Sequence, residues 1–271
     1  MKPPKSLYKF RCWNSEKHRR ILTEDQIWFT SARKFNDPFD CTIPLRYDLL
    51  SDEDFVQRAA KLATRYNPAL DSAKANQEAR SLLATHPFRD PKRVEDAKRD
   101  LTDSIINSYG IFSLSAVLEN ILMWSHYADS HRGFCIEYDS QKLMDMFDRL
   151  FDKSELIIFL RPIKYMSEYP IPIPSPDLDD DKDDETWMQL LTTKSNYWSY
   201  EKEWRCLYVG QVNKGLVLDP GIITSVYLGC RMLPEHRNQI ANLLSSRSPK
   251  VALYQAEKVE NAFGLDFHRI N

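Results

Sequence analysis

Stretches of alternating or uninterrupted apolar residues predict strands, and they gather near both ends of the chain. Residues 6–13 (SLYKFRCW) alternate aromatic and basic side chains, as a half-buried strand does. Residues 198–210 (WSYEKEWRCLYVG) join two glutamates to an apolar run, which predicts a strand with a charged start. Further strands are expected from residue 27 and at residues 110–115, 133–139, 156–165, 223–229 and 250–258.

Helical patterns separate the early strands from the later ones. Ser51 with Asp54 fits a capping box, residues 71–86 predict a second helix, and Asp90-Pro91 opens a third that ends near Gly110. Shorter helices are expected within residues 14–26, at 119–129, near 185–194 and after Pro234.

These elements predict an α+β fold. Strands from both ends meet in one mixed or antiparallel β core, which makes residues 1–271 a single domain with a helical insertion at residues 51–108. Residues 169–185 run from alternating prolines into a dense acidic run. They predict an extended segment followed by a solvated loop.

Composition narrows the class of protein. Hydrophobic residues make up 42% and charged residues 28%, as in ordinary soluble proteins, and the net charge of −2 gives no general attraction to nucleic acid or anionic membranes. No secretory signal is visible, and no apolar run is long enough to cross a bilayer. The five cysteines contain no CxxC pair, so we expect reduced thiols in a cytoplasmic protein.

Motifs for common cofactors and metals are missing from the sequence. Neither GxGxxG nor GxxxxGK[ST] occurs, which argues against Rossmann and P-loop nucleotide sites. The acidic run fails as an EF-hand at Lys182 and Met188, and His126 and His131 are five apart, not four. We therefore predict no metal site.

Several polar residues lie on predicted strands at a spacing of two. Residues two apart on a strand share a face, so Glu201 and Glu203 are either a catalytic pair or a solvated strand edge. Ser113 and Ser115 share a face in the same way, as binding residues or as ordinary polar positions. Arg11 follows Lys9 on one face, as an anion site or as solvated cations.

Two other segments offer binding residues. Trp124, His126 and Tyr127 crowd one short predicted helix, as an aromatic wall for a flat ring or as a packed core. In FNDPFD (35–40), Asn36 is a candidate for a cofactor contact, with a structural Asx-type turn as the alternative.

Four motifs carry a resemblance to a known family. With LYKFR, FNDPFD, MWSHYA and YEKEWR together, the chain is identified as a member of the bacterial family called domain of unknown function 2971, from about residue 7 to 230. A more distant resemblance is to ADP-ribosyltransferases of the arginine–serine–glutamate class. Their three strand motifs correspond to Arg11, Ser113-Leu114-Ser115 and Glu201-Lys202-Glu203, with SLS in place of Ser-Thr-Ser and a longer spacing to the third motif.

The second resemblance implies an ADP-ribosyltransferase-like fold and transfer of ADP-ribose from NAD to a macromolecule that the sequence does not identify. A toxin or a phage-defence effector would use this activity. It implies that Glu203 is catalytic, that Glu201 acts on the acceptor and that Arg11 holds a phosphate or ribose oxygen. Ser113 and Ser115 would support the site, and Trp124, His126, Tyr127 and Asn36 would contact the cofactor.

Two alternatives remain open from the sequence. The chain is a catalytically inactive module of the same fold that binds a nucleotide or a partner protein, or it is a nuclease or other hydrolase that uses His126 and the carboxylates.

Overall fold

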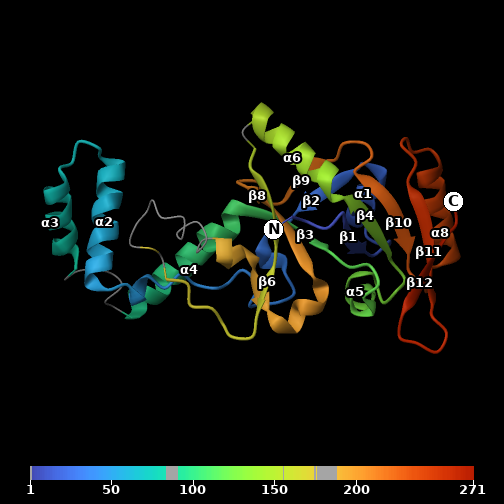
Figure 1. The fold of residues 1–271 in the computed structure, drawn as a ribbon, viewed down its shortest axis with the longest axis horizontal. Helices are drawn as coiled ribbons and strands as arrows, with labels where there is room; N and C mark the ends of the chain where they lie inside the picture. The colour runs from blue at the N-terminus through green and yellow to red at the C-terminus, as the bar shows by residue number, and fades with distance from the viewer. Residues whose placement is uncertain (1, 84–90, 155, 174, 176–187) are drawn as a thin grey trace. The chain divides into compact units, whose positions relative to one another are not determined.

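The computed structural model describes residues 2–83, 91–154, 156–173, 175 and 188–271 (Figure 1). The chain forms two compact units. Unit 1 comprises residues 1–34, 108–163 and 197–271, and unit 2 comprises residues 35–107 and 164–196. Helices and a mostly antiparallel sheet confirm the α+β class.

An eight-stranded sheet organises unit 1. In spatial order its strands are β12 (Leu265–Arg269), β11 (Ala252–Lys258), β10 (Ile223–Leu228), β4 (Phe134–Asp139), β1 (Ser6–Arg11), β3 (Tyr109–Ser115), β8 (Glu203–Val209) and β5 (Ile158–Pro162). Neighbouring strands are antiparallel except β10 and β11, which are parallel. As expected, the sheet joins strands from both ends of the chain, with β1 near its centre.

Helices cover both faces of this sheet. The helices α1 (Glu16–Thr23), α6 (Ser140–Ser154) and α8 (Pro234–Ser245) pack on one face with the short sheet of β2 (Gln26–Phe29) and β9 (Lys214–Val217). The helix α5 (Ile121–Tyr127) packs on the other face, and Figure 1 shows α5 and α6 on opposite sides of the strands. We call these the α6 face and the α5 face.

The alternation in β1 explains why both faces are covered. Leu7 is buried in the core of the α6 face, and Phe10 is buried against Trp124 in the core of the α5 face. Because successive side chains of a strand point to opposite faces, one strand supplies both cores.

Unit 2 contains the expected helices. They are α2 (Asp52–Tyr66), α3 (Ser72–Leu82) and α4 (Pro91–Ser108), beside a parallel pair of β6 (Lys164–Met166) and β7 (Thr193–Ser195). The predicted cap is present, since Ser51 Oγ accepts a hydrogen bond from the Asp54 backbone N–H at 3.1 Å. Helices α2 and α3 lie side by side around Val56, Ala60, Ala75 and Ala79.

Some expectations about elements are wrong. Residues 156–165 do not form one strand, because β5 ends at Pro162 and β6 begins at Lys164 in a different sheet. The helix α6 and the strands β9 and β12 were not expected. Most of the predicted acidic loop, residues 176–187, lies outside the described residues. Within the described ranges, no helix combines the length and apolar character that a membrane span needs.

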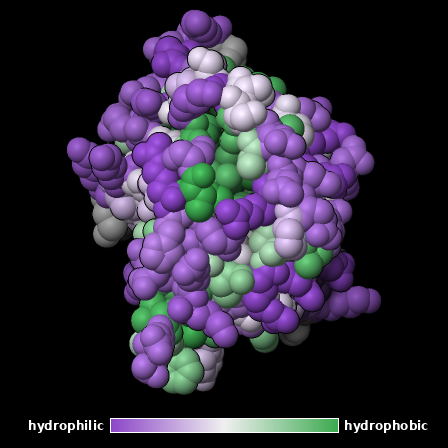
Figure 2. All heavy atoms as spheres, turned by 90° about the vertical axis from the view of Figure 1, so that its right-hand side faces the viewer, coloured by the Kyte–Doolittle hydropathy of each residue, from purple (hydrophilic) through white to green (hydrophobic). Residues whose placement is uncertain are grey.

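The end of unit 1 that carries α8, β11 and β12 has a largely polar surface. Figure 2 shows this face as mostly hydrophilic, with smaller apolar areas between the polar side chains. Leu233, Phe263 and Ile270 are exposed apolar residues of these segments. Exposed apolar side chains of this kind are ordinary on soluble proteins.

Candidate functional site

The three strands that carry the candidate motifs are neighbours in the sheet of unit 1. The strand β3 lies between β1 and β8. Tyr8 of β1 lies opposite Ser115 of β3, and Ser115 lies opposite Glu203 of β8. Directly opposite residues share a face, so these three side chains form a polar row on the α5 face.

Arg11 does not join this row. It is three positions beyond Tyr8, so its side chain leaves β1 on the α6 face, opposite to Ser115 and Glu203. Close to it, Cys12 Sγ lies 3.1 Å from His18 Nδ1. Burial, with the positive charges of Arg11 and Lys9, lowers the pKa of His18 to about 4.

Lys9, like Arg11, leaves β1 on the α6 face, but its ammonium reaches the backbone of motif strand β3. The strands β1 and β3 pair only at Tyr8 and Ser115. Next to this pair, the Lys9 ammonium donates a hydrogen bond to the backbone oxygen of Ser113. Burial and the charge of Arg11 lower the pKa of Lys9 well below 10.5, while Glu203 and Glu201 act to raise it. Lys9 therefore lies within electrostatic range of both glutamates.

Glu201 and Glu203 are not two apart on one strand. Glu201 ends the 3₁₀ helix η4 (Asn196–Glu201), Lys202 has a φ of +45°, and β8 begins at Glu203. The left-handed turn at Lys202 breaks the period-two pattern on which the shared face was predicted. The prediction that strand geometry aligns the two carboxylates is therefore wrong.

The alternative of a solvated strand edge is also wrong for these glutamates. Glu201 is 3% exposed and Glu203 is 5% exposed, and β8 lies between β3 and β5. The Glu203 carboxylate accepts hydrogen bonds from Arg205, at 2.8 Å from Nε and 3.3 Å from Nη2. Arg205 is fully buried, so this is an ion pair inside the protein.

Two side chains fix the segment that carries Glu201. Ser115 Oγ donates a hydrogen bond to the Glu201 backbone oxygen at 2.7 Å. Asn120 caps α5 by accepting from the Leu122 backbone N–H, and its Nδ2 donates to the Tyr200 backbone oxygen at 3.0 Å. Ser113 lies opposite Arg205 on the same face, so Ser115, not Ser113, is the cross-strand neighbour of Glu203.

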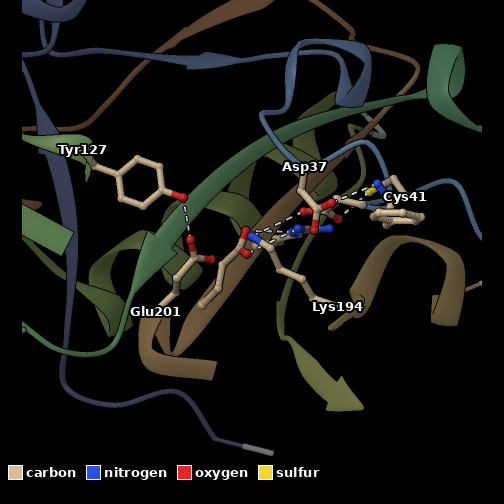
Figure 3. Close-up of polar contacts among 9 residues, drawn as sticks. Asp37, Cys41, Tyr127, Lys194 and Glu201 are labelled. Carbon is tan, nitrogen blue, oxygen red and sulfur yellow. Dashed lines mark hydrogen bonds and ion pairs between the residues drawn. The ribbon is translucent and has the colours of Figure 1, made fainter. Parts of the chain in front are cut away.

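Tyr127 contacts the Glu201 side chain directly. Its hydroxyl donates to Glu201 Oε1 at 2.5 Å, and Figure 3 shows the ring of Tyr127 directed at this carboxylate. A short hydrogen bond to an ionised group is among the stronger polar contacts in proteins. It holds the Glu201 carboxylate in one orientation.

Aromatic side chains continue from Tyr127 along α5 and η4. His126 is exposed, and its ring centroid lies 6.3 Å from that of Tyr127 and 6.3 Å from that of Tyr200, which is 6.1 Å from Trp198. Trp124 has no exposed surface, and its indole N–H donates to the Leu118 backbone oxygen at 2.8 Å. The partly exposed rings beside Glu201 are therefore Tyr127, Tyr200 and Trp198.

The FNDPFD segment belongs to unit 2, and Asn36 is exposed there. Asp37 Oδ1 accepts from the Phe39 backbone N–H at 2.9 Å, which confirms an Asx-type turn. Asp40 forms a buried ion pair with Lys194 at 3.4 Å, and Cys41 Sγ lies 3.4 Å from Asp40 Oδ1. Figure 3 labels Asp37, Cys41 and Lys194 of this unit.

Sequence reasoning missed Asn120, Tyr200 and Arg205 as members of the site, and it named Lys9 only as the neighbour of Arg11. Lys9 had a signal, because it stands in the first motif strand beside Arg11. Arg205 lies two positions after Glu203, which is the spacing of a same-face pair on a strand. Within the residues that the structure describes, no three His, Cys, Asp or Glu side chains are grouped so as to hold a metal ion.

Part of the chain matches a known family model. Residues 123–206 match the family model described as Protein of unknown function (DUF2971). The match includes MWSHYA and YEKEWR but covers less than a third of the chain. No significant match was found among curated proteins or solved structures. This segment, which contains most of α5, all of β4 and the start of β8, is therefore similar to that family.

Proposed function

We propose that the protein is an NAD-dependent ADP-ribosyltransferase of the arginine–serine–glutamate type. The observation that carries the proposal is the adjacency of β1, β3 and β8, with Ser115 in register with Glu203. The three motif strands are distant in sequence, so their contact is not a consequence of chain order.

The reaction would break the bond between the nicotinamide nitrogen and the ribose. The bonding electrons leave with nicotinamide, and positive charge develops on the ribose ring, as in glycoside hydrolysis. A buried carboxylate stabilises such a charge better than a solvated one does, because little water screens it. Glu203 is the proposed stabilising carboxylate, and Glu201 would accept the proton of the attacking acceptor group.

Lys9 takes the place in this proposal that the resemblance gives to Arg11. Its side chain also leaves β1 on the α6 face, but its ammonium donates a hydrogen bond to the Ser113 backbone oxygen of β3 and interacts electrostatically with both glutamates. A cation there would hold a phosphate or ribose oxygen of NAD. Tyr127, Tyr200 and Trp198 offer ring faces for nicotinamide or for the acceptor.

One observation favours a second function, an inactive module that binds a nucleotide. The Glu203 carboxylate is engaged by Arg205, and an engaged carboxylate stabilises a developing cation less than an unpaired one. In an active enzyme, substrate binding would have to displace or share this ion pair. An effector role in toxicity or phage defence follows only from the active form.

The test measures NAD binding and nicotinamide release by the whole chain. The variants are Glu203→Gln and Glu201→Gln, with Glu260→Gln as a control at an exposed position. We expect Glu203→Gln to lower nicotinamide release by roughly 10²-fold or more while NAD still binds. Because Glu203→Gln also breaks a buried pair, Tyr127→Phe provides a milder second variant with a smaller expected loss.

The outcomes separate the two functions. NAD binding without turnover, unchanged in Glu203→Gln, supports the inactive module. If folded wild-type protein neither binds nor cleaves NAD, the transferase proposal is wrong.

A further inference from the structure

A second charged site lies on the α5 face at Glu137, two strands away from β3. Glu137 of β4 lies opposite Tyr8 on one side and opposite Ser225 of β10 on the other. Glu137 is partly exposed. Among the described residues, no Lys, Arg or His side chain forms an ion pair with it, although the cations Lys9 and Arg11 leave β1 nearby on the α6 face.

Hydroxyl groups keep this carboxylate ionised. The Tyr227 hydroxyl donates to Glu137 Oε2 at 3.0 Å. Burial raises the pKa of Glu137, but hydrogen bonds from Ser6, Ser225, Tyr227 and Thr224 outweigh it and lower the pKa below 4.5. Glu137 therefore carries a negative charge at neutral pH, and no basic side chain among the described residues pairs with it.

Aromatic rings flank the charge. The Tyr8 and Tyr227 ring centroids are 6.3 Å apart in an edge arrangement, and Tyr254 stacks on Tyr227 at 4.8 Å. Phe267 extends the group across β12, at 5.3 Å from Tyr227. Tyr8 and Tyr254 are partly exposed. Ring faces beside a carboxylate attract cations through the ring quadrupole as well as through charge.

We propose that Glu137 with the rings of Tyr8, Tyr227 and Tyr254 binds an alkylated ammonium group, of the quaternary or methylated amine type. The carboxylate already accepts hydrogen bonds from several hydroxyls, which leaves few acceptor positions for a bidentate guanidinium. An alkylated ammonium needs charge and ring faces more than hydrogen-bond acceptors. The site uses none of Glu201, Glu203 and Lys9, so it can be tested separately from the proposed NAD site, although its Tyr8 also lies opposite Ser115.

The test titrates the full chain with choline and with its neutral isostere, in which a quaternary carbon replaces the nitrogen. Ligand-observed NMR or calorimetry at constant ionic strength reports binding. We expect choline to bind at least about tenfold more tightly than the isostere, and the preference to disappear in Glu137→Gln. Equal binding of both compounds, or no saturable binding of choline, overturns the proposal.

Ring variants separate recognition from folding. Tyr8→Phe keeps the ring and should bind choline like the wild type, whereas Tyr8→Leu should weaken binding by about tenfold. Tyr66→Leu, at an exposed tyrosine of unit 2, and Glu260→Gln are the matched controls. Choline binding that is unchanged in Tyr8→Leu and in Glu137→Gln, with the fold intact by circular dichroism, shows that binding occurs elsewhere and rejects this site.

Discussion

Replacing Glu203 by Gln should destabilise the protein whatever its role in catalysis. Arg205 is fully buried, and its Nε lies 2.8 Å from Glu203 Oε1. Removing one partner of a buried pair leaves the other charge uncompensated, which typically costs about 3–5 kcal/mol. Glutamine keeps the size and one acceptor oxygen of glutamate, so we expect about 3 kcal/mol, or a fall in Tm of roughly 10 °C.

A double-mutant cycle separates the pair from other effects. The free energy of unfolding is measured by urea denaturation for wild type, Glu203→Gln, Arg205→Met and the double variant. Because the double variant leaves neither charge unpaired, it should lose less than the sum of the single losses, with a coupling energy of about 1–3 kcal/mol. If the losses are additive, or if Glu203→Gln is as stable as the wild type, the ion pair of Glu203 and Arg205 is not the buried, energetically coupled pair described above.

Three further changes test other parts of unit 1. The pKa of His18 falls to about 4 in the folded protein, so the unfolded state binds more protons as the pH drops below 6.5. Stability should therefore decline between pH 6.5 and 4, less steeply in His18→Gln, and urea midpoints across this range measure the difference. Asn120→Ala removes the cap of α5 and the bond to Tyr200, and should cost about 1–2 kcal/mol in urea unfolding, whereas a neutral result excludes a capping role. In Gly133→Ala the new Cβ would overlap the Arg11 backbone oxygen, so we expect a loss of about 3 kcal/mol and a lower Tm, and an unchanged Tm contradicts the close approach.

Much of the fold follows from local patterns. The strand at residues 6–11 follows from alternation, and the cap at Ser51 and the proline at the start of α4 follow from helix chemistry. The helix α6 had a readable signal, because Leu143, Met146, Phe147 and Leu150 keep helical spacing on one buried face. The strand β12 had little signal, since its sequence LDFHR is short and charged, and only its pairing with β11 and the packing of Leu265 and Phe267 in the α5-face core show it to be a strand.

The candidate site was predictable as a set of strands but not as a set of side chains. The order of the motifs suggested that β1, β3 and β8 belong together, and the structure places them side by side. Which face each side chain takes depends on register and on single backbone angles. The positive φ at Lys202 separates Glu201 from the strand. The strands β1 and β3 pair only at Tyr8 and Ser115, and the Lys9 ammonium instead binds the Ser113 backbone oxygen. Neither feature has a sequence pattern of its own.

Nicotinamide release from NAD by the purified whole chain tests the central claim most directly. The proposal predicts release by the wild type, at least about a hundredfold less release by folded Glu203→Gln, and an unchanged rate in Glu260→Gln. Equal release by wild type and Glu203→Gln, or no interaction of NAD with the folded wild-type protein, contradicts it.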